Sequence, residues 1–490
     1  MRARTRKNTM KKFNPIPAIH PLARHPFATL LLATPLLAIT LLVTGCATPP
    51  PYQKPAIEVP GAFKESSLWK AASPGTATVP DDWWLLFNDP TLNDLQKQII
   101  VGNENLKSSA AQVQVARAAL GSSRAGLLPT VGASAGGSLS AVPGSAATNR
   151  SYSAVANATW ELDLWGRVSG NVGSAEARLQ ASADDLAAAR LSVQAVLTQT
   201  YFSLRAAESQ AALLDRSVAA YQRSLELTQN RYTAGVSSAA DVAQAQTQLK
   251  STQAQRVEAN SSRAQLEHAL ATLLGKPSAL LTLPRTANLP HALNIPVQLP
   301  ASLIERRPDI AAAERRVAAA NAQIGVAQSA FFPAVTLSAN GGFRGGDLAQ
   351  LLSAPNLFWS LGPALAATLF DGGARKSAED SARASLDQAA ASYRQTVLTA
   401  LQEVEDNLVI AASLQEEIAL QTDALAAAQR NLDITNNQYK AGTVSYLNVV
   451  TAQATALGAE RTLLDVQTRR LAAITQLLKN LGGRWERVGT

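Results

Sequence analysis

The chain has 490 residues, of which 47% are hydrophobic and only 5% aromatic, and its formal net charge is +8. Residues 1–45 hold seven basic residues and no acidic one, so the remainder carries only 8 − 7 = +1. A nearly neutral body offers no basic face to nucleic acid, and we expect no nucleic-acid partner.

The N-terminus has the pattern of a signal peptide. A basic leader precedes an apolar run from Phe27 to Val43. Met10 is an alternative start to Met1, because it gives a leader of more usual length. We therefore expect residues 1–45 to be a lipoprotein signal peptide.

Val43–Cys46 resembles a bacterial lipobox, in which the cysteine is diacylated and becomes the mature N-terminus. Cys46 is the only cysteine of the chain, so no internal disulfide is possible. The alternative, a chance buried thiol, does not explain its position directly after the apolar run. We expect a covalent lipid on Cys46 and no other cofactor. Ala47, which is not the Asp of retained lipoproteins, resembles the sorting pattern of outer-membrane lipoproteins.

Residues 46–90 are predicted to be a lipidated tether, because Pro49–Pro80 is rich in Pro, Ala and Ser and has no periodicity. Trp83 and Trp84 follow it, and we expect them to pack against the body; a ligand platform is the alternative. Thr91 is predicted to cap the next helix. A further helix from about Asn103 is expected to end near Leu128 and Pro129.

Four stretches then alternate with a period of two residues, which predicts two β-hairpins at about 130–164 and 334–370. Each strand has about ten to thirteen residues, one uncharged apolar face and one mostly polar face. A membrane-spanning strand needs about 9–11 tilted residues with this alternation. A half-buried sheet of a soluble protein alternates in the same way.

Strand length, uncharged apolar faces and the lipid anchor favour a membrane β-barrel, as do aromatic residues near the expected interfaces (Tyr152, Trp160, Phe343 and Trp359). Four strands cannot close a barrel, and open sheet edges do not survive in lipid. We therefore expect an oligomer, and three copies would supply twelve strands.

A long internal repeat favours one architecture built twice over the three domains that the length alone suggests. Asn230–Gln246 and Asn437–Gln453 share eight residues at a constant offset of 207. Each contains a Tyr-x-Ala-Gly segment that follows a long arm without proline and precedes a second helical pattern. Apolar or tyrosine residues recur every seven places along the arms (Leu197, Leu204, Ala211, Val218, Leu225 and Tyr232; Val397, Val404, Ala411, Ile418, Leu425, Leu432 and Tyr439).

The predicted class is mainly α with a membrane β-barrel part, and each arm would run about 100 Å. Residues 91–290 form the first repeat, with its helical-hairpin tip at 233–238, and 291–484 form the second, with its tip at 440–445. The proline-rich segment Lys276–Pro308 links the two outside the main helical wall, and 485–490 is a C-terminal tail. An ordinary coiled-coil rod is the alternative for the arms alone.

The whole mature chain resembles the TolC/OprM-type outer-membrane factors, in their lipid-anchored branch. The motifs that carry the resemblance occur in the family's order and spacing. They are Trp83-Trp84 with Asp89-Pro90, Leu127–Pro129 and Phe331–Pro333, Leu162–Arg167 and Leu369–Gly373, Leu303–Ile310, and the two Tyr-x-Ala-Gly tips.

The resemblance implies a passive trimeric conduit with a twelve-stranded barrel in the outer membrane and a helical barrel across the periplasm. It would export small molecules such as drugs or toxic compounds within a tripartite efflux system. The partners would be outer-membrane lipid, a periplasmic adaptor and an inner-membrane pump, commonly of the resistance-nodulation-division type. Antibiotics, solvents, aromatic acids and signalling lipids all remain possible cargo. The competing class is a non-channel coiled-coil envelope lipoprotein.

By the same resemblance, Gly235, Val236, Gly442 and Thr443 would form adaptor-docking tips. Relatives often carry carboxylates at a periplasmic aperture just past the second tip, where this chain has neutral Asn448 and Thr451. The first repeat keeps Asp241, which would either line the aperture or only stabilise the start of its helix.

The sequence lacks the signals of an enzyme. Past the leader it has two histidines, His268 and His291, and no thiol beyond Cys46. It contains no phosphate-binding loop, nucleophile elbow or cluster of metal ligands. We expect neither catalytic residues nor a metal site.

Overall fold

The computed structural model describes residues 51–60, 63–64, 82–141, 148–290 and 307–481. The described residues belong to one compact unit, Thr48–Thr490. The predicted signal peptide, Cys46, the tail 485–490 and Leu303–Arg306 of the family motif lie outside the described residues.

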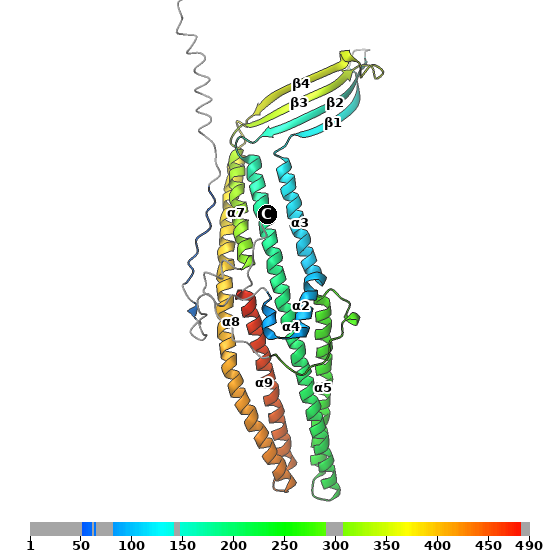
Figure 1. Cartoon of the computed structure of the whole chain (residues 1–490), viewed down its shortest axis with the longest axis vertical. Helices are drawn as coiled ribbons and strands as arrows, with labels where there is room; N and C mark the ends of the chain where they lie inside the picture. Colours follow the sequence, from blue (N-terminus) through cyan, green and yellow to red (C-terminus); the bar gives the residue numbers. More distant parts are fainter. Residues whose placement is uncertain (1–50, 61–62, 65–81, 142–147, 291–306, 482–490) are drawn as a thin grey trace, which may run out of the picture. The chain divides into compact units, whose positions relative to one another are not determined.

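Two helices of equal length run through the structure, in agreement with the predicted arms. They are α4, Arg167–Thr233, and α8, Ala374–Lys440, each of 67 residues, and their first and last residues differ by the offset of the tip repeat. At about 1.5 Å per residue, each is about 100 Å long. The chain returns through α5, Ala239–Leu273, and α9, Tyr446–Leu481, so each repeat ends in a helical hairpin (Figure 1).

The predicted seven-residue rows form much of the core. Leu197, Leu204, Val397, Val404 and Ala411 are buried, because these rows face neighbouring helices. Burial weakens toward the tips, and Tyr232 is 49% exposed although its repeat equivalent Tyr439 is buried. The two repeats therefore share a pattern but not identical neighbours.

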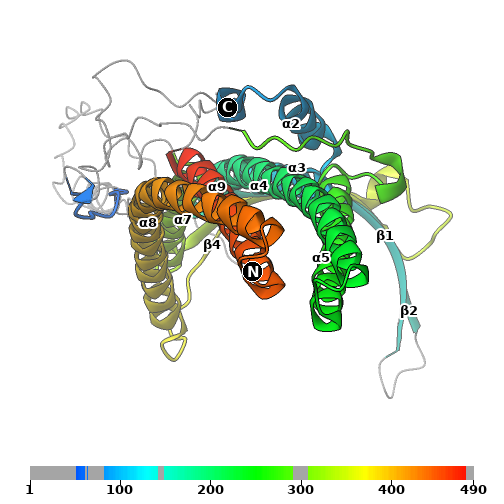
Figure 2. The same ribbon diagram turned by 90° about the horizontal axis from the view of Figure 1, so that it is seen from below.

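The shorter helices pack on these arms at their middle and at the end near the sheet. They are α2, Pro90–Gly102, α3, Glu104–Ala125, and α7, Pro308–Ser329. Helix α4 contacts α3, α5, α7 and α9, and α8 contacts α7 and α9. Seen along the helices, α8, α9, α4 and α5 follow one another in a curved row (Figure 2). One chain thus builds a curved segment of helical wall.

The four predicted strands form one antiparallel sheet in the order β1-β2-β3-β4 at the end of the helices opposite the two tips (Figure 1). The strands are β1, Thr130–Ala141, β2, Thr148–Leu162, β3, Ala334–Gly345, and β4, Leu357–Ala366. The two hairpins are joined through β2 and β3, which pair from Tyr152↔Gly345 to Leu162↔Val335.

Several predicted boundaries were wrong. β4 ends at Ala366 and does not reach 370, β2 has 15 residues, and α3 ends at Ala125. Asp89, and not Thr91, caps α2: its carboxylate accepts hydrogen bonds from the backbone N–H groups of Thr91 and Leu92. A carboxylate before Pro90 suits this role, because proline at the first helical position needs no acceptor for an N–H.

The tryptophan pair packs against the body, as predicted. Trp83 is fully buried and Trp84 is 5% exposed. They open a short 3₁₀ helix, η2, Trp83–Phe87, and the ring of Phe87 lies 4.8 Å from that of Phe202 on α4. No helix among the described residues is both long enough and apolar enough to span a membrane.

Candidate functional site

Both helical-hairpin tips turn in the same way at a glycine. Gly235 has φ +76° and Gly442 has φ +78°, in the left-handed region that other residues adopt at a cost. The Val236 N–H donates to the Arg231 carbonyl, and the Thr443 N–H donates to the Gln438 carbonyl. These bonds satisfy carbonyls at the ends of α4 and α8, as in a Schellman motif.

The predicted docking residues lie at the surface of these tips. Val236 is 64% exposed, and Gly235, Gly442 and Thr443 are also exposed. A Cβ atom added at Gly235 would meet nothing within 4 Å. The glycine is therefore required by the backbone and not by crowding, and the apex is open to a partner.

The candidate aperture residues lie in the first two turns of the returning helices, Asp241 and Asn448 in the first turn and Thr451 in the second. The Asp241 carboxylate accepts from the N–H and the hydroxyl of Ser238, whose Oγ accepts in turn from the Asp241 N–H, and this forms a capping box. Asp241 is half-buried. The helix-start role considered for Asp241 is thus present in the structure, and its exposure to a pore stays a prediction.

Asn448 and Thr451 in the second repeat are both exposed on α9. The Thr451 hydroxyl donates to the Leu447 carbonyl of the preceding turn. Asn448 occupies the place of Asp241 in the repeat and is neutral. One copy therefore presents a single carboxylate at the three candidate aperture positions.

A seam of polar contacts, which the sequence patterns did not predict, joins the two hairpins close to their tips. Tyr439 on α8 is buried, and its hydroxyl lies 3.3 Å from the Oγ1 of Thr228 on α4 and 3.3 Å from the Oγ of Ser237. The Arg231 guanidinium lies 4.8 Å from the centre of the Tyr439 ring. The repeated tyrosine was a usable signal, but periodicity does not show which of its two copies is buried.

The sheet has two chemically distinct faces, and the predicted alternation is confirmed. Because residues opposite each other in an antiparallel ladder share a face, Ala133, Ala156, Gly341 and Trp359 lie on one face and Gly132, Asn157, Asn340 and Ser360 on the other. The first face is apolar and exposed in one copy: Val131, Leu361 and Leu365 are each more than 60% exposed.

Aromatic residues lie at both ends of this apolar face. Trp160 is near the helical end, and Tyr152 is eight residues away toward the far end. At roughly 3.3 Å per residue this separation is about 26 Å along the strand. Among the described strand residues, the one charge on this face is Arg150, which is opposite Leu139 and lies beyond Tyr152. An uncharged band flanked by aromatic residues matches the lipid-facing surface of a membrane barrel.

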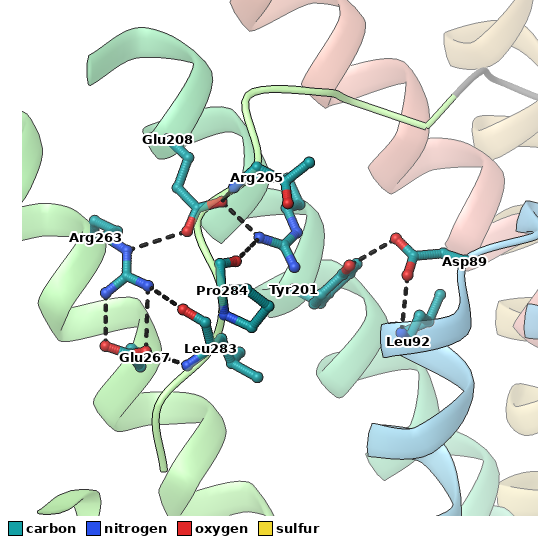
Figure 3. A network of polar contacts seen from close by, with 10 residues as sticks. Asp89, Leu92, Tyr201, Arg205, Glu208, Arg263, Glu267, Leu283 and Pro284 are labelled. Atoms are coloured by element: carbon teal, nitrogen blue, oxygen red, sulfur yellow. Dashed lines mark hydrogen bonds and ion pairs between the residues drawn. The ribbon is translucent and has the colours of Figure 1, made fainter. Parts of the chain in front are cut away.

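A buried ionic network fastens the segment after α5 to the helical wall (Figure 3). Glu208 on α4 accepts from Arg205 on its own helix at 2.6 Å and from Arg263 on α5 at 3.1 Å. Arg263 also pairs with Glu267 at 2.6 Å. All four side chains are at most 13% exposed, and two positive charges balance two negative ones.

The same network holds the backbone of the linker. Arg205 donates to the Pro284 carbonyl, and Arg263 donates to the Leu283 carbonyl. Burial alone would raise the pKa of Glu267, but the hydrogen bond from the Leu283 N–H and the Arg263 ion pair outweigh it and hold that pKa below its ordinary value. The linker, up to Pro290 in the described residues, therefore has a fixed path over the wall (Figure 2).

A second contact of this region joins α4 to the cap of α2. The Tyr201 hydroxyl donates to the Asp89 carboxylate at 2.6 Å. Burial and this hydrogen bond raise the pKa of Tyr201 to about 12. Among the described residues, no group of three or more His, Cys, Asp or Glu side chains could hold a metal ion. The two clusters around Glu208 and Asp89 join helices and the linker to one another.

The chain matches the family model described as "Outer membrane efflux protein" over residues 95–276 and 299–483. It is 30% identical over 453 residues to the toluene efflux pump outer membrane protein TtgC of Pseudomonas putida, covering 91% of this chain and 94% of that protein. It is 32% identical to the outer membrane protein OprJ of Pseudomonas aeruginosa, and the match covers 91% of this chain and 95% of that protein. It is 30% identical to the cation efflux system protein CusC of Escherichia coli K12, and the match covers 91% of this chain and 98% of that protein.

Solved structures show the same fold. The outer-membrane channel OprN superposes with a TM-score of 0.83 at 30% identity, covering 90% of this chain and all of that chain. The open state of the MtrE outer membrane channel of Neisseria gonorrhoeae gives a TM-score of 0.79 at 28% identity, and the match covers 89% of this chain and 98% of that chain. Such proteins are transport conduits and not enzymes, and they act in the outer membrane with a periplasmic extension. The chain belongs to the outer membrane efflux protein family.

Proposed function

We propose that three copies of this chain form one passive conduit, with a twelve-stranded barrel in the outer membrane and a helical barrel across the periplasm. The main support is the four-stranded sheet, which exposes an apolar face with an uncharged band between Trp160 and Tyr152 and leaves one edge of β1 and one edge of β4 without a partner in the described chain. An apolar face suits lipid, but unpaired backbone groups do not. Three copies give twelve strands, an even number within the range of known barrels.

The curved row of helices supports the same assembly. One copy supplies four long helical segments in this row (Figure 2), and three copies would supply twelve. The exposed glycine tips at the opposite end fit docking of a periplasmic adaptor, and an inner-membrane pump of the resistance-nodulation-division type would drive transport. In this assembly the pump supplies the energy, and the conduit itself is passive.

We propose that the cargo is small molecules, with drugs or other toxic compounds as the first class to test. The names of the relatives include toluene, antibiotic and cation efflux. Relatives of similar identity thus differ in cargo, which agrees with a duct whose substrate is chosen by its pump.

Conductance tests the conduit. Purified protein inserted into a planar bilayer should give discrete ion-conducting steps, and only from fractions that run as trimers on a native gel. A trimer that never conducts would favour the coiled-coil envelope lipoprotein, and a conducting monomer would contradict the closed twelve-stranded barrel.

We also propose that Cys46 carries the lipid anchor, on the strength of the lipobox-like Val43–Cys46 segment. Two or three acyl chains give stable anchoring at about 0.8 kcal/mol per buried methylene. Cys46→Ser should abolish metabolic labelling with a radioactive fatty acid, while trimers still form because the barrel anchors the protein too. Label that persists in the variant would refute the assignment.

A further inference from the structure

The two helical hairpins place an arginine at equivalent positions. Helices α5 and α9 begin 207 residues apart, at Ala239 and Tyr446, and α4 and α8 have the same offset at both ends. Arg470 on α9 is therefore the repeat equivalent of Arg263 on α5. Since α9 packs against α8 as α5 packs against α4, the surroundings of the two arginines can be compared residue by residue.

The first repeat supplies carboxylates to its arginine, and the second does not. Arg263 donates to Glu208 at 3.1 Å and to Glu267 at 2.6 Å (Figure 3). The residues equivalent to these two carboxylates are Gln415 and Ile474, neither of which can carry a charge. The second repeat thus keeps the arginine and lacks both of its partners.

Arg470 is buried with its charge uncompensated. It is 7% exposed, and its Nε has no hydrogen-bond partner. Burial lowers the pKa of its guanidinium, whereas at Arg263 the same effect of burial is outweighed by Glu267 and Glu208, which raise the pKa. Because arginine stays protonated at neutral pH, this place needs an anion that the described chain does not supply.

A cavity of about 880 Å³, which we call the Arg470 cavity, lies beside this guanidinium. It is lined by α4, α8, α9 and linker residues 287–290, and both Arg470 and Gln415 belong to its lining. Much of the wall is apolar (Leu213, Ile418, Leu425, Leu463, Leu464 and Leu471). Small-molecule sites in proteins have volumes of about 300–1,000 Å³, so the cavity is large enough for a ligand.

The charges in the Arg470 cavity are arranged along its length. Arg216 and Glu460 also line it, and they form an ion pair at 2.7 Å that neutralises both. Glu460 precedes Arg470 by ten residues on α9, which is about 15 Å at 1.5 Å per residue. Among the described lining residues, one positive charge at Arg470 is left over, and the leucine side chains of α9 lie between it and the neutral pair.

We propose that the Arg470 cavity binds a small amphiphilic acid, with its carboxylate on Arg470 and its unbranched apolar tail along the leucine wall, as a fatty acid would fit. A guanidinium matches a carboxylate through two parallel hydrogen bonds. The ligand carboxylate takes the place that Glu208 has beside Arg263. One negative charge balances the cavity, whereas a phosphate monoester brings about −1.5 to −2.

This site belongs to one copy of the chain and is separate from transport through the conduit, so it does not rest on the proposed function. Equilibrium dialysis of the purified full-length protein in amphipol against radiolabelled octanoate tests it. Octanoate should bind saturably, with one site per copy. Octanamide lacks the charge and acetate lacks the tail, and each should compete about tenfold less well or worse. Octyl phosphate should also compete less well than octanoate.

Two variants test the role of the arginine. Arg470→Gln should weaken octanoate binding by about tenfold or more, because it removes a charged hydrogen-bond donor. Gln415→Glu should weaken it similarly while the protein stays folded, because the new carboxylate neutralises the guanidinium as Glu208 does in the first repeat. The matched control is Arg469→Gln: that side chain is 56% exposed and lies 3.8 Å from Asp465, and its loss should leave the affinity within about twofold.

Several results would overturn the site. Equal octanoate binding by Arg470→Gln and the unmodified protein would show that the arginine does not hold the ligand. Equal competition by octanoate and octanamide would reduce the binding to apolar contact, and stronger competition by octyl phosphate would contradict a carboxylate. Absence of saturable binding would mean that water alone fills the cavity. None of these results affects the conduit, which bilayer conductance tests independently.

Discussion

Arg470 on α9 is a buried cation that makes no hydrogen bond or ion pair with any described residue. It is 7% exposed, its Nε has no partner, and burial lowers the pKa of its guanidinium. An arginine still keeps its charge at neutral pH. It lines a cavity of about 880 Å³ between α4, α8, α9 and the linker, together with Leu463, Leu464 and Leu471. Such a group costs stability in the isolated chain.

We predict that Arg470→Leu stabilises the protein by about 1–3 kcal/mol, because it removes a buried donor with no partner. The free energy of unfolding in urea would measure it. Arg216→Leu is the control: that side chain is 67% exposed, pairs with Glu460 at 2.7 Å, and should change stability by about 0–1 kcal/mol. Destabilisation by Arg470→Leu would instead show that the assembled protein supplies a partner for the guanidinium.

At the scale of elements, the ionic network around Glu208 joins elements far apart in the sequence, whereas the glycine tips reverse the chain locally. The network joins α4, α5 and the linker. Its four charged residues come from two helices and bind the backbone between Leu283 and Thr286. The helical periodicity of the sequence does not predict these contacts. The tips, by contrast, depend on local backbone geometry and repeat in the sequence.

We predict that Glu208→Gln destabilises the protein by about 3–5 kcal/mol, because it leaves Arg205 and Arg263 buried with only Glu267 to balance them. Glu460→Gln, which removes a surface pair, should cost about 0–1 kcal/mol. Urea unfolding of both variants decides the matter, and similar losses would contradict a special role for the buried network.

At the tips, replacement of Gly235 or Gly442 by Trp should abolish efflux while the trimer level stays normal. The left-handed backbone penalises a side chain by about 1–2 kcal/mol, and the new ring blocks the docking surface. Drug susceptibility and native gels measure the two effects. Photo-crosslinkers at Val236 and Thr443 should capture the adaptor, and their consistent failure would place docking elsewhere.

At the scale of the whole molecule, the assembly decides which face of the sheet meets lipid and what the tips enclose. Ala156 lies between Ala133 and Gly341 at the middle of the apolar face, and Leu337 lies opposite Trp160 nearer the helical end. The depth of a substitution in the membrane, as well as its face, should therefore determine its cost.

We predict that Ala156→Arg costs about 2–4 kcal/mol and that Leu337→Arg costs less because it is nearer the interface. Arg at Asn157, on the other face, should be tolerated. Trimer yield after membrane insertion measures all three. Equal yields would show that the apolar face does not meet lipid.

The tips of an assembled trimer are predicted to prefer cations weakly, with modest block by multivalent cations from the periplasmic side. If the three Asp241 carboxylates line a narrow opening, their field on passing ions is strengthened by the low dielectric around them. Asp241→Asn should reduce the preference and Asn448→Asp should deepen it, as read from bilayer reversal potentials under a salt gradient. Unchanged selectivity in both would leave Asp241 only its role in the capping box.

The sequence by itself determined the features that repeat locally. The arms, the glycine turns and the two faces of the strands follow from periods of seven and two and from the left-handed backbone at Gly235 and Gly442. These signals depend only on neighbours along the chain. That is also why the four strands and two helical hairpins were predicted, although β2 is longer and β4 ends earlier than expected.

Only the tertiary structure decided which repeated residue is buried, what holds the linker and where β4 ends. Tyr439 is buried against Thr228 and Ser237 of the first hairpin, whereas its repeat equivalent Tyr232 is 49% exposed, so equivalent positions meet different neighbours. Glu208 and Arg263 are 55 residues apart, and no sequence spacing predicts that they form an ion pair. β4 stops at Ala366 because a strand exists only where a neighbouring strand supplies its hydrogen bonds, and the β3 ladder ends at Ala334↔Ala366. The residues of β4 alone do not show where β3 begins.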